Sequence, residues 1–141
     1  MVKNLMDRID KILNHDLFLY HLGRNNAAEA DRRFCRHSMV HFLDVARIGT
    51  IIALEEGLKI DREWIYAAAL LHDCGKHEQY ENGTPHEQAS ARIAPEILKA
   101  CGFDDEETGV IVTAISRHRD PEAAREKNLN GILYRADKAR S

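Results

Sequence analysis

The chain has 141 residues and a net charge of −3, with acidic and basic residues interspersed. This balance argues against a dedicated nucleic-acid binder, and no apolar run approaches the roughly 20 residues that a membrane-spanning helix needs. The three cysteines form neither a Cys-x-x-Cys zinc pattern nor a disulfide framework, so we expect a reducing, cytoplasmic setting. A chain of this length is expected to fold as one domain, residues 1–141.

Apolar residues recur at helical spacing along most of the chain. The predicted helices cover about residues 2–22, 27–36, 37–56, 62–73, 85–100 and 104–118, with a last one starting at about 129. Asn25-Asn26 is predicted to break the first part of the chain, and the polar stretch 76–83 is predicted to be a loop. No strand-like alternation of useful length occurs. We therefore expect an all-α, single-domain helical bundle of about six helices.

Two helix starts carry recognisable capping residues. Thr84 is a good N-cap, Pro85 suits the first helical position, and Glu87 is placed to complete a capping box. This assignment puts His86 in the first turn of its helix. Acidic residues 104–107 likewise suit the N-terminus of the next helix. Pro95 falls inside the predicted helix and is expected to kink or divide it.

Six polar residues fall on or beside apolar helix faces, and they come from five different helices. They are His41, His72, Asp73, His86, His118 and Asp137. Four imidazoles and two carboxylates suit first-row metals such as iron, manganese, zinc or nickel. The set lacks thiolates and exceeds what one tetrahedral zinc needs, which argues against a closed structural zinc site. Facing helices of a bundle are a recurrent place for such a centre.

Five residues of this set, taken singly, also have a plainer explanation. His72 and Asp73 follow an apolar run and are compatible with a solvated helix end. His86 is compatible with a surface or capping role, and His118 with neutralising the C-terminal end of its own helix. Asp137 has Arg135 and Arg140 as alternative partners. The six residues point to a metal site only when they are considered together.

Three motifs connect these residues to a known family. They are His41-x-x-x-Val45-Ala46, Leu70-Leu71-His72-Asp73-x-Gly75-Lys76 and Tyr134-Arg135-Ala136-Asp137. Together they resemble the HD-domain superfamily of metal-dependent phosphohydrolases, over about residues 35–140. The resemblance implies that His41, His72, Asp73 and Asp137 bind one metal ion. His86 and His118 resemble the two extra histidines of the binuclear branches, in which Asp73 would bridge both ions.

The resemblance also implies an activity. We expect a metal-dependent phosphohydrolase that cleaves a phosphoester or phosphoanhydride of a nucleotide-like small molecule with a metal-activated water. Two divalent ions are expected, iron in the first place, with manganese, nickel and zinc as alternatives. The expected partner is a small phosphorylated substrate, a nucleotide in the first place, and a homodimer is an open alternative. Neither a membrane nor a nucleic acid is expected as a partner.

Further residues receive roles near these ligands. Asp73 is expected to orient the water, and Lys76 to contact a substrate phosphate, although a solvated lysine explains Lys76 equally well. His37 lies four residues before His41, the offset of a general acid in some HD phosphodiesterases, and an exposed histidine is the alternative. Arg117 and Arg119 flank His118 and are candidates for binding further phosphates, one of them being a plain surface residue.

Two other functions stay open. A diiron oxygenase of the HD fold predicts iron specifically, and oxygen consumption without phosphatase activity. A non-catalytic, metal-containing ligand-binding module predicts tight binding without turnover and a large loss of melting temperature on chelation.

Overall fold

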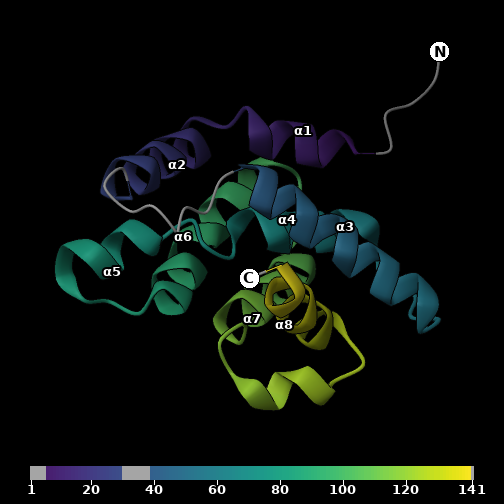
Figure 1. Cartoon of the computed structure of the whole chain (residues 1–141). Coiled ribbons are helices and arrows are strands. Elements are labelled where there is room, and N and C mark those ends of the chain that lie inside the picture. Colours follow the sequence, from purple (N-terminus) through teal and green to yellow (C-terminus); the bar gives the residue numbers. More distant parts are fainter. Residues whose placement is uncertain (1–5, 30–38, 141) are drawn as a thin grey trace.

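The computed structural model describes residues 6–29 and 39–140 of the chain. All regular structure in these residues is helical, which confirms the predicted all-α class. The helices are α1 (Asp7–Leu13), α2 (Asp16–Ala28), α3 (Met39–Glu55), α4 (Arg62–Leu71), α5 (Lys76–Asn82), α6 (His86–Ala100), α7 (Asp105–Ser116), the 3₁₀ helix η1 (Pro121–Arg125) and α8 (Leu129–Arg140). Figure 1 shows α1 and α2 along one side of the molecule, with α7, η1 and α8 on the opposite side.

Helix α4 lies in the core because its C-terminal half is apolar on every side. Residues 67–71 have no exposed surface, as expected for a helix without a polar face. Helix α4 packs against α1, α3, α6, α7 and α8. This burial carries the next two residues, His72 and Asp73, into the interior, where their side chains are almost inaccessible to solvent.

The first part of the chain forms two helices rather than the single one predicted over residues 2–22. Helix α1 ends at the C-cap Asn14, and the Nδ1 atom of His15 accepts the backbone N–H of Leu17 as the N-cap of α2. A capping side chain at this point satisfies an N–H that a continuous helix would have bonded internally. The chain can therefore turn here, and α1 and α2 pack separately.

Helix α2 continues through the predicted break at residues 25–26, because the side chain of Asn25 has distant partners. Its Nδ2 donates to the carbonyl of Asp73 at 2.9 Å, and its Oδ1 accepts the backbone N–H of His77 at 2.8 Å. These buried hydrogen bonds outweigh the weak helix propensity of asparagine. Residues 27–28 are helical as predicted, but they end α2 instead of beginning a separate helix over 27–36, and the part of that helix from residue 30 lies outside the described residues.

The stretch predicted as a loop, residues 76–83, is mostly the helix α5. Its backbone is bonded to Asn25 at His77, and the rings of His77 and His21 meet with Nε2 and Nδ1 2.8 Å apart. Gly83 ends the helix in the left-handed conformation, at φ 81°. The polar composition of this stretch led to the loop prediction. The helix is stabilised by packing against α2 and α6 rather than by an apolar stripe.

The start of α6 differs from the predicted capping box. Pro85 occupies the N-cap position, and no side chain caps the helix from there. The hydroxyl of Thr84 donates instead to the Asn82 side chain at 2.6 Å. Pro95 does not divide α6, because the helix buries Ile97 and other apolar residues beyond it. The second predicted cap is confirmed, since Asp104 and the N3 glutamate of α7 form a capping box.

The other predicted boundaries agree closely with the structure. Helix α3 covers residues 39–55 of the predicted 37–56, and its first two predicted residues lie outside the described part. The side chain of Asp61 caps α4 by accepting the N–H of Glu63, as expected. The described residues hold eight α-helices and one 3₁₀ helix, more than the predicted six, because α1 and α2 are separate and α5 is helical.

Helix α1 buries Ile9 and Ile12 in the core, and one arginine anchors it further. The guanidinium of Arg8 donates to Glu63 on α4 at 2.8 Å and to Glu107 on α7 at 2.9 Å. The same group lies 4.1 Å above the centre of the Phe103 ring. Because all three partners lie far from Arg8 in the chain, this cluster fixes α1 against two other helices.

Replacing Arg8 with alanine is therefore expected to destabilise the fold. The substitution leaves two partly buried carboxylates without their cation, at a cost of about 1–3 kcal/mol in the free energy of unfolding. Urea denaturation measures the change. In contrast, Lys11→Ala removes an exposed ion pair with Asp7 and is expected to change stability by less than about 1 kcal/mol. Equal effects of the two substitutions would contradict the anchoring role of Arg8.

Candidate metal centre

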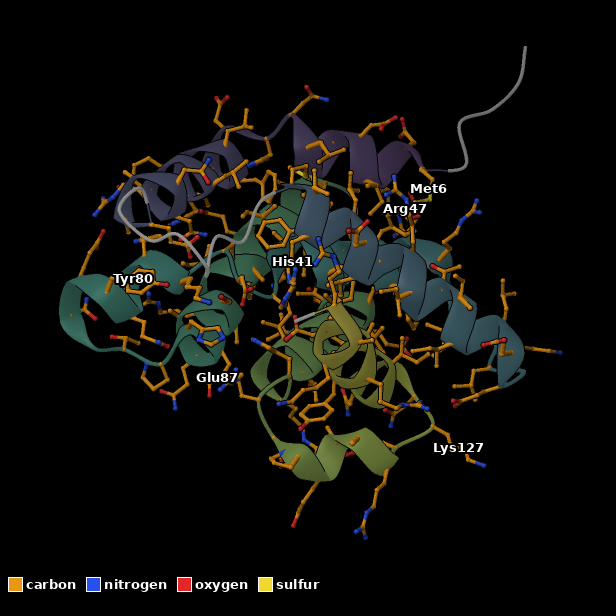
Figure 2. The ribbon with its side chains drawn as sticks, viewed as in Figure 1. Met6, His41, Arg47, Tyr80, Glu87 and Lys127 are labelled. Carbon is orange, nitrogen blue, oxygen red and sulfur yellow. The ribbon has the colours of Figure 1, made fainter. Side chains whose placement is uncertain are left out.

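The six candidate ligands meet at one place in the fold. His41 comes from the first turn of α3, His72 and Asp73 follow α4, His86 begins α6, His118 follows α7, and Asp137 lies on α8. All are buried except Asp137, which is partly accessible. Figure 2 shows His41 near the centre of the molecule, away from the labelled Tyr80, Glu87 and Lys127.

The ligand atoms form overlapping groups, two of which share Asp73, while His72, His118 and Asp137 also lie within 4.8 Å of one another. In the first group, Nε2 of His72 lies 3.3 Å from Asp73 Oδ2 and 3.3 Å from Asp137 Oδ1. Nε2 of His41 lies 3.4 Å from the same Asp137 oxygen. The candidate ligand atoms of His41, His72 and Asp73 all lie within 4.8 Å of one another.

The second group faces the other oxygen of the same carboxylate. Asp73 Oδ1 lies 3.4 Å from Nε2 of His86 and 3.5 Å from Nε2 of His118. The two Nε2 atoms are themselves 3.1 Å apart. One carboxylate therefore directs one oxygen at each cluster of imidazoles, which is the arrangement of a bridging ligand between two ions.

Hydrogen bonds at the opposite ring nitrogen identify the tautomers of three histidines. Nδ1 of His72 lies 2.6 Å from the carbonyl of Ala69, and Nδ1 of His118 lies 2.7 Å from the carbonyl of Ile115. A carbonyl oxygen only accepts, so Nδ1 carries the hydrogen in both rings. When these rings are neutral, each presents a lone pair at Nε2.

The third histidine is His86, and its acceptor is a side chain. Nδ1 of His86 lies 2.8 Å from Oε1 of Gln79, and the same oxygen accepts the backbone N–H of His86 at 3.0 Å. Because a backbone N–H only donates, the amide atom at this point is the oxygen, and Nδ1 of His86 is a donor. His86 Nε2 therefore also presents a lone pair.

The arrangement of the ring lone pairs shows whether the site suits a cation. Neutral His86 and His118 place two lone pairs 3.1 Å apart beside a carboxylate oxygen, and lone pairs repel unless a cation or proton lies between them. The fully buried His72 places its Nε2 3.3 Å from a carboxylate oxygen of Asp73 and 3.3 Å from one of Asp137, a setting that favours positive charge. Buried acceptors without donors are costly, so the donor set fits divalent metal ions.

The pKa values at the centre follow from its charges. Burial lowers the pKa of His86 to about 4, although the Asp73 carboxylate opposes the shift. Burial also disfavours the His72 cation, but the charges of Asp73 and Asp137 outweigh it and raise the His72 pKa to about 9. Burial acts to raise the pKa of Asp137, but hydrogen bonds that its carboxylate accepts from His41 and His72 outweigh burial and hold that pKa below its usual range. The carboxylates thus favour a positive charge at the first group.

Three other predicted site residues, Lys76, Arg117 and His37, differ in how they relate to this centre. Lys76 begins α5, close enough to His86 for its charge to contribute to the lowered pKa of that ring. Arg117, at the end of α7, forms ion pairs with Asp120 before η1 and with Glu126 after it. His37 lies outside the described residues, so its predicted role as general acid stays a prediction.

A cavity of about 310 Å³ opens directly at the centre. Its lining residues are His118, Arg119, Pro121, Tyr134, Asp137 and Lys138. Arg119 therefore shares a cavity with two candidate ligands, whereas Arg117 is not among the lining residues. The sequence interpretation missed Tyr134 and Lys138, although the signal was present: they lie three residues before and one residue after Asp137 on α8.

Comparison with known proteins identifies the family of this chain. A family model described as HD domain matches residues 39–140, which include all six candidate ligands. The chain belongs to the HD-domain family. A relative from Clostridium beijerinckii, described as an uncharacterized protein, is 49% identical over 133 residues, which cover 94% of this chain and 83% of that protein.

A solved structure gives the same result for the HD-domain fold. The crystal structure of a predicted HD superfamily hydrolase from an uncultured Thermotogales bacterium superposes with a TM-score of 0.64 and 27% sequence identity. The match covers 85% of this chain and 66% of that chain, so this HD-domain protein spans about two thirds of its solved relative. Across residues 6–29 and 39–140, no helix combines the length and the apolar character needed to cross a bilayer.

Proposed function

We propose that this HD-domain protein is a metal-dependent phosphohydrolase with two divalent ions. His41, His72, Asp73 and Asp137 would hold the first ion, and Asp73, His86 and His118 the second. The observation that carries the proposal is the position of Asp73, whose Oδ2 faces His72 while its Oδ1 faces His86 and His118. Four imidazoles and two carboxylates suit iron, with manganese, nickel and zinc as alternatives.

Divalent ions at these ligands supply an activated water and positive charge for the phosphoryl oxygens. The chain contributes the rest of the chemistry. Asp73, as a buried carboxylate, is proposed to orient the water. Lys76 is proposed to hold a substrate phosphate from the α5 side, near His86. The charge of a lysine favours the dianionic phosphate over neutral molecules of the same size.

The cavity beside the centre supports a nucleotide-like substrate. Arg119 and Lys138 line it with two positive charges, and Arg119 has the planar donor geometry that binds phosphate oxygens in pairs. The ring of Tyr134 lies in the same wall, and an aromatic ring stacks favourably on a base. We therefore propose a small phosphorylated substrate that carries an aromatic group. Arg117 remains a weaker candidate for phosphate binding, because it is engaged by two carboxylates.

Metal removal tests this proposal directly. We expect element analysis of the purified protein to find about two ions per chain, and chelation to abolish the release of phosphate from a panel of nucleotides. Addition of iron, manganese or nickel should restore the release. The melting temperature should fall on chelation, because ions that bind the folded state stabilise it by mass action.

Other outcomes would contradict the proposal in distinguishable ways. Oxygen consumption with iron, without phosphate release, would identify an oxygenase. Tight binding of nucleotides without turnover, with both ions present, would identify a ligand-binding module. A protein that binds no metal would overturn the assignment of the centre altogether.

A further inference from the structure

The three identified Nδ1 acceptors in the centre are not equivalent. His72 and His118 donate to the carbonyl of the residue three positions earlier in their own helical segments. These acceptors are backbone atoms, so no substitution of a side chain removes them. His86 is the first residue of α6, and its Nδ1 acceptor is instead the side chain of Gln79 on α5. His86 is thus the one ring of the three whose orientation depends on a replaceable residue.

We propose that Gln79 is a positioning residue that sets the affinity of the second ion through His86. This inference rests on the proposed two-ion function. Oε1 of Gln79 holds His86 at two points, the ring Nδ1 at 2.8 Å and the backbone N–H at 3.0 Å. The first contact selects the tautomer with a lone pair at Nε2, and an acceptor at Nδ1 makes the opposite nitrogen a better ligand. The second contact fixes the backbone from which the ring extends.

The backbone contact also takes the place of a missing helix cap. The first N–H groups of a helix lack internal acceptors, and Pro85 at the N-cap provides no side-chain bond. Gln79 satisfies the N–H of His86 from a neighbouring helix. The first residue of α6 and its ring are therefore held by the same oxygen atom, 2.8–3.0 Å from both nitrogens.

The position of α5 does not depend on Gln79. Asn25 bonds the backbone of α5 at His77, and the His77 ring meets His21 on α2. The Gln79 residue itself is exposed, so its substitution leaves no cavity in the core. Loss of the amide should consequently affect His86 far more than the helix that carries it.

Titration of the metal-free full-length chain with Mn²⁺ tests the inference. We expect Gln79→Leu to weaken the binding of one of two Mn²⁺ equivalents by about 10–100-fold and to leave the other unchanged. The electron paramagnetic resonance spectrum should change from that of a coupled pair of ions to that of a single ion. Gln79→Glu retains an acceptor oxygen and should restore both equivalents. Gln88→Leu is the control. It makes the same change on α6, two residues beyond His86 and on a different helix face, and it should leave both Mn²⁺ equivalents bound as in the wild type.

Each contrary outcome has a separate meaning. If the wild-type chain binds both equivalents and Gln79→Leu does so with unchanged affinities, Gln79 has no positioning role, while the proposed function stands. If the wild-type chain binds a single equivalent, the two-ion function fails and this inference fails with it. If Gln79→Leu lowers the melting temperature of the metal-free protein and loses both equivalents, the role of Gln79 is structural and the inference is wrong.

Discussion

Asp73→Asn is expected to abolish phosphate release while leaving the helical fold intact. The amide has the size of the carboxylate but no charge, and it offers a nitrogen in place of one of the two oxygens that face His72 and His86. Loss of the negative charge and of one of the two bridging oxygen contacts should lower kcat by about 1,000-fold or more, equivalent to about 4 kcal/mol of transition-state stabilisation. The expected metal content falls below that of the wild type.

Steady-state kinetics on the best substrate of the nucleotide panel, together with element analysis, measures this effect. Asp105→Asn is the matched control, because Asp105 is an exposed aspartate in the first turn of α7. The control should keep the wild-type kcat and metal content. A variant Asp73→Asn that retains full activity would rule out a bridging role for this carboxylate, and with it the two-ion assignment.

Gly75→Ala is expected to cause the largest loss of stability among the glycine substitutions near the centre. A Cβ atom at this position would lie 2.7 Å from the backbone carbon of Ala89 and 2.7 Å from the backbone nitrogen of Ser90. The backbone of Gly75, at φ −96°, is open to any residue, so the effect is steric crowding alone. The Gly75 N–H also donates to the Ser90 hydroxyl at 2.9 Å, which holds the two segments together.

Relief of this clash requires α6 to move away from the segment after α4, and α6 carries His86. We expect a loss of about 3 kcal/mol in the free energy of unfolding, and weaker binding of one metal ion. Urea denaturation and Mn²⁺ titration measure the two effects. Gly109→Ala is the control, since a Cβ there meets no atom within 4 Å and alanine favours a helix by up to about 1 kcal/mol. Unchanged stability of Gly75→Ala would show that α6 does not lie as closely as described.

The helices that bury an apolar stripe were predictable, and those held by polar contacts were not. The apolar run before His72 predicted a buried helix, and this burial brings His72 and Asp73 into the core. Helix α5 has no such run, because its position depends on bonds from Asn25 to the backbone of His77. The spacing of apolar residues in a single sequence does not reveal a hydrogen bond between residues 52 positions apart.

The candidate ligands were likewise predictable from the sequence, whereas their grouping and their neighbours were not. The four histidines and two aspartates could be proposed from residue type, their place beside apolar faces and the family resemblance. Residue type and apolar spacing along the chain were thus sufficient for the all-α class and for the list of candidate ligands, because both are properties of short segments. The division of the ligands into two groups around Asp73 required the folded chain, since it depends on which carboxylate oxygen faces which ring. The contact of Gln79 with His86 required it as well, because residues 76–83 were predicted to be a loop and the contact depends on the helix α5 that they form.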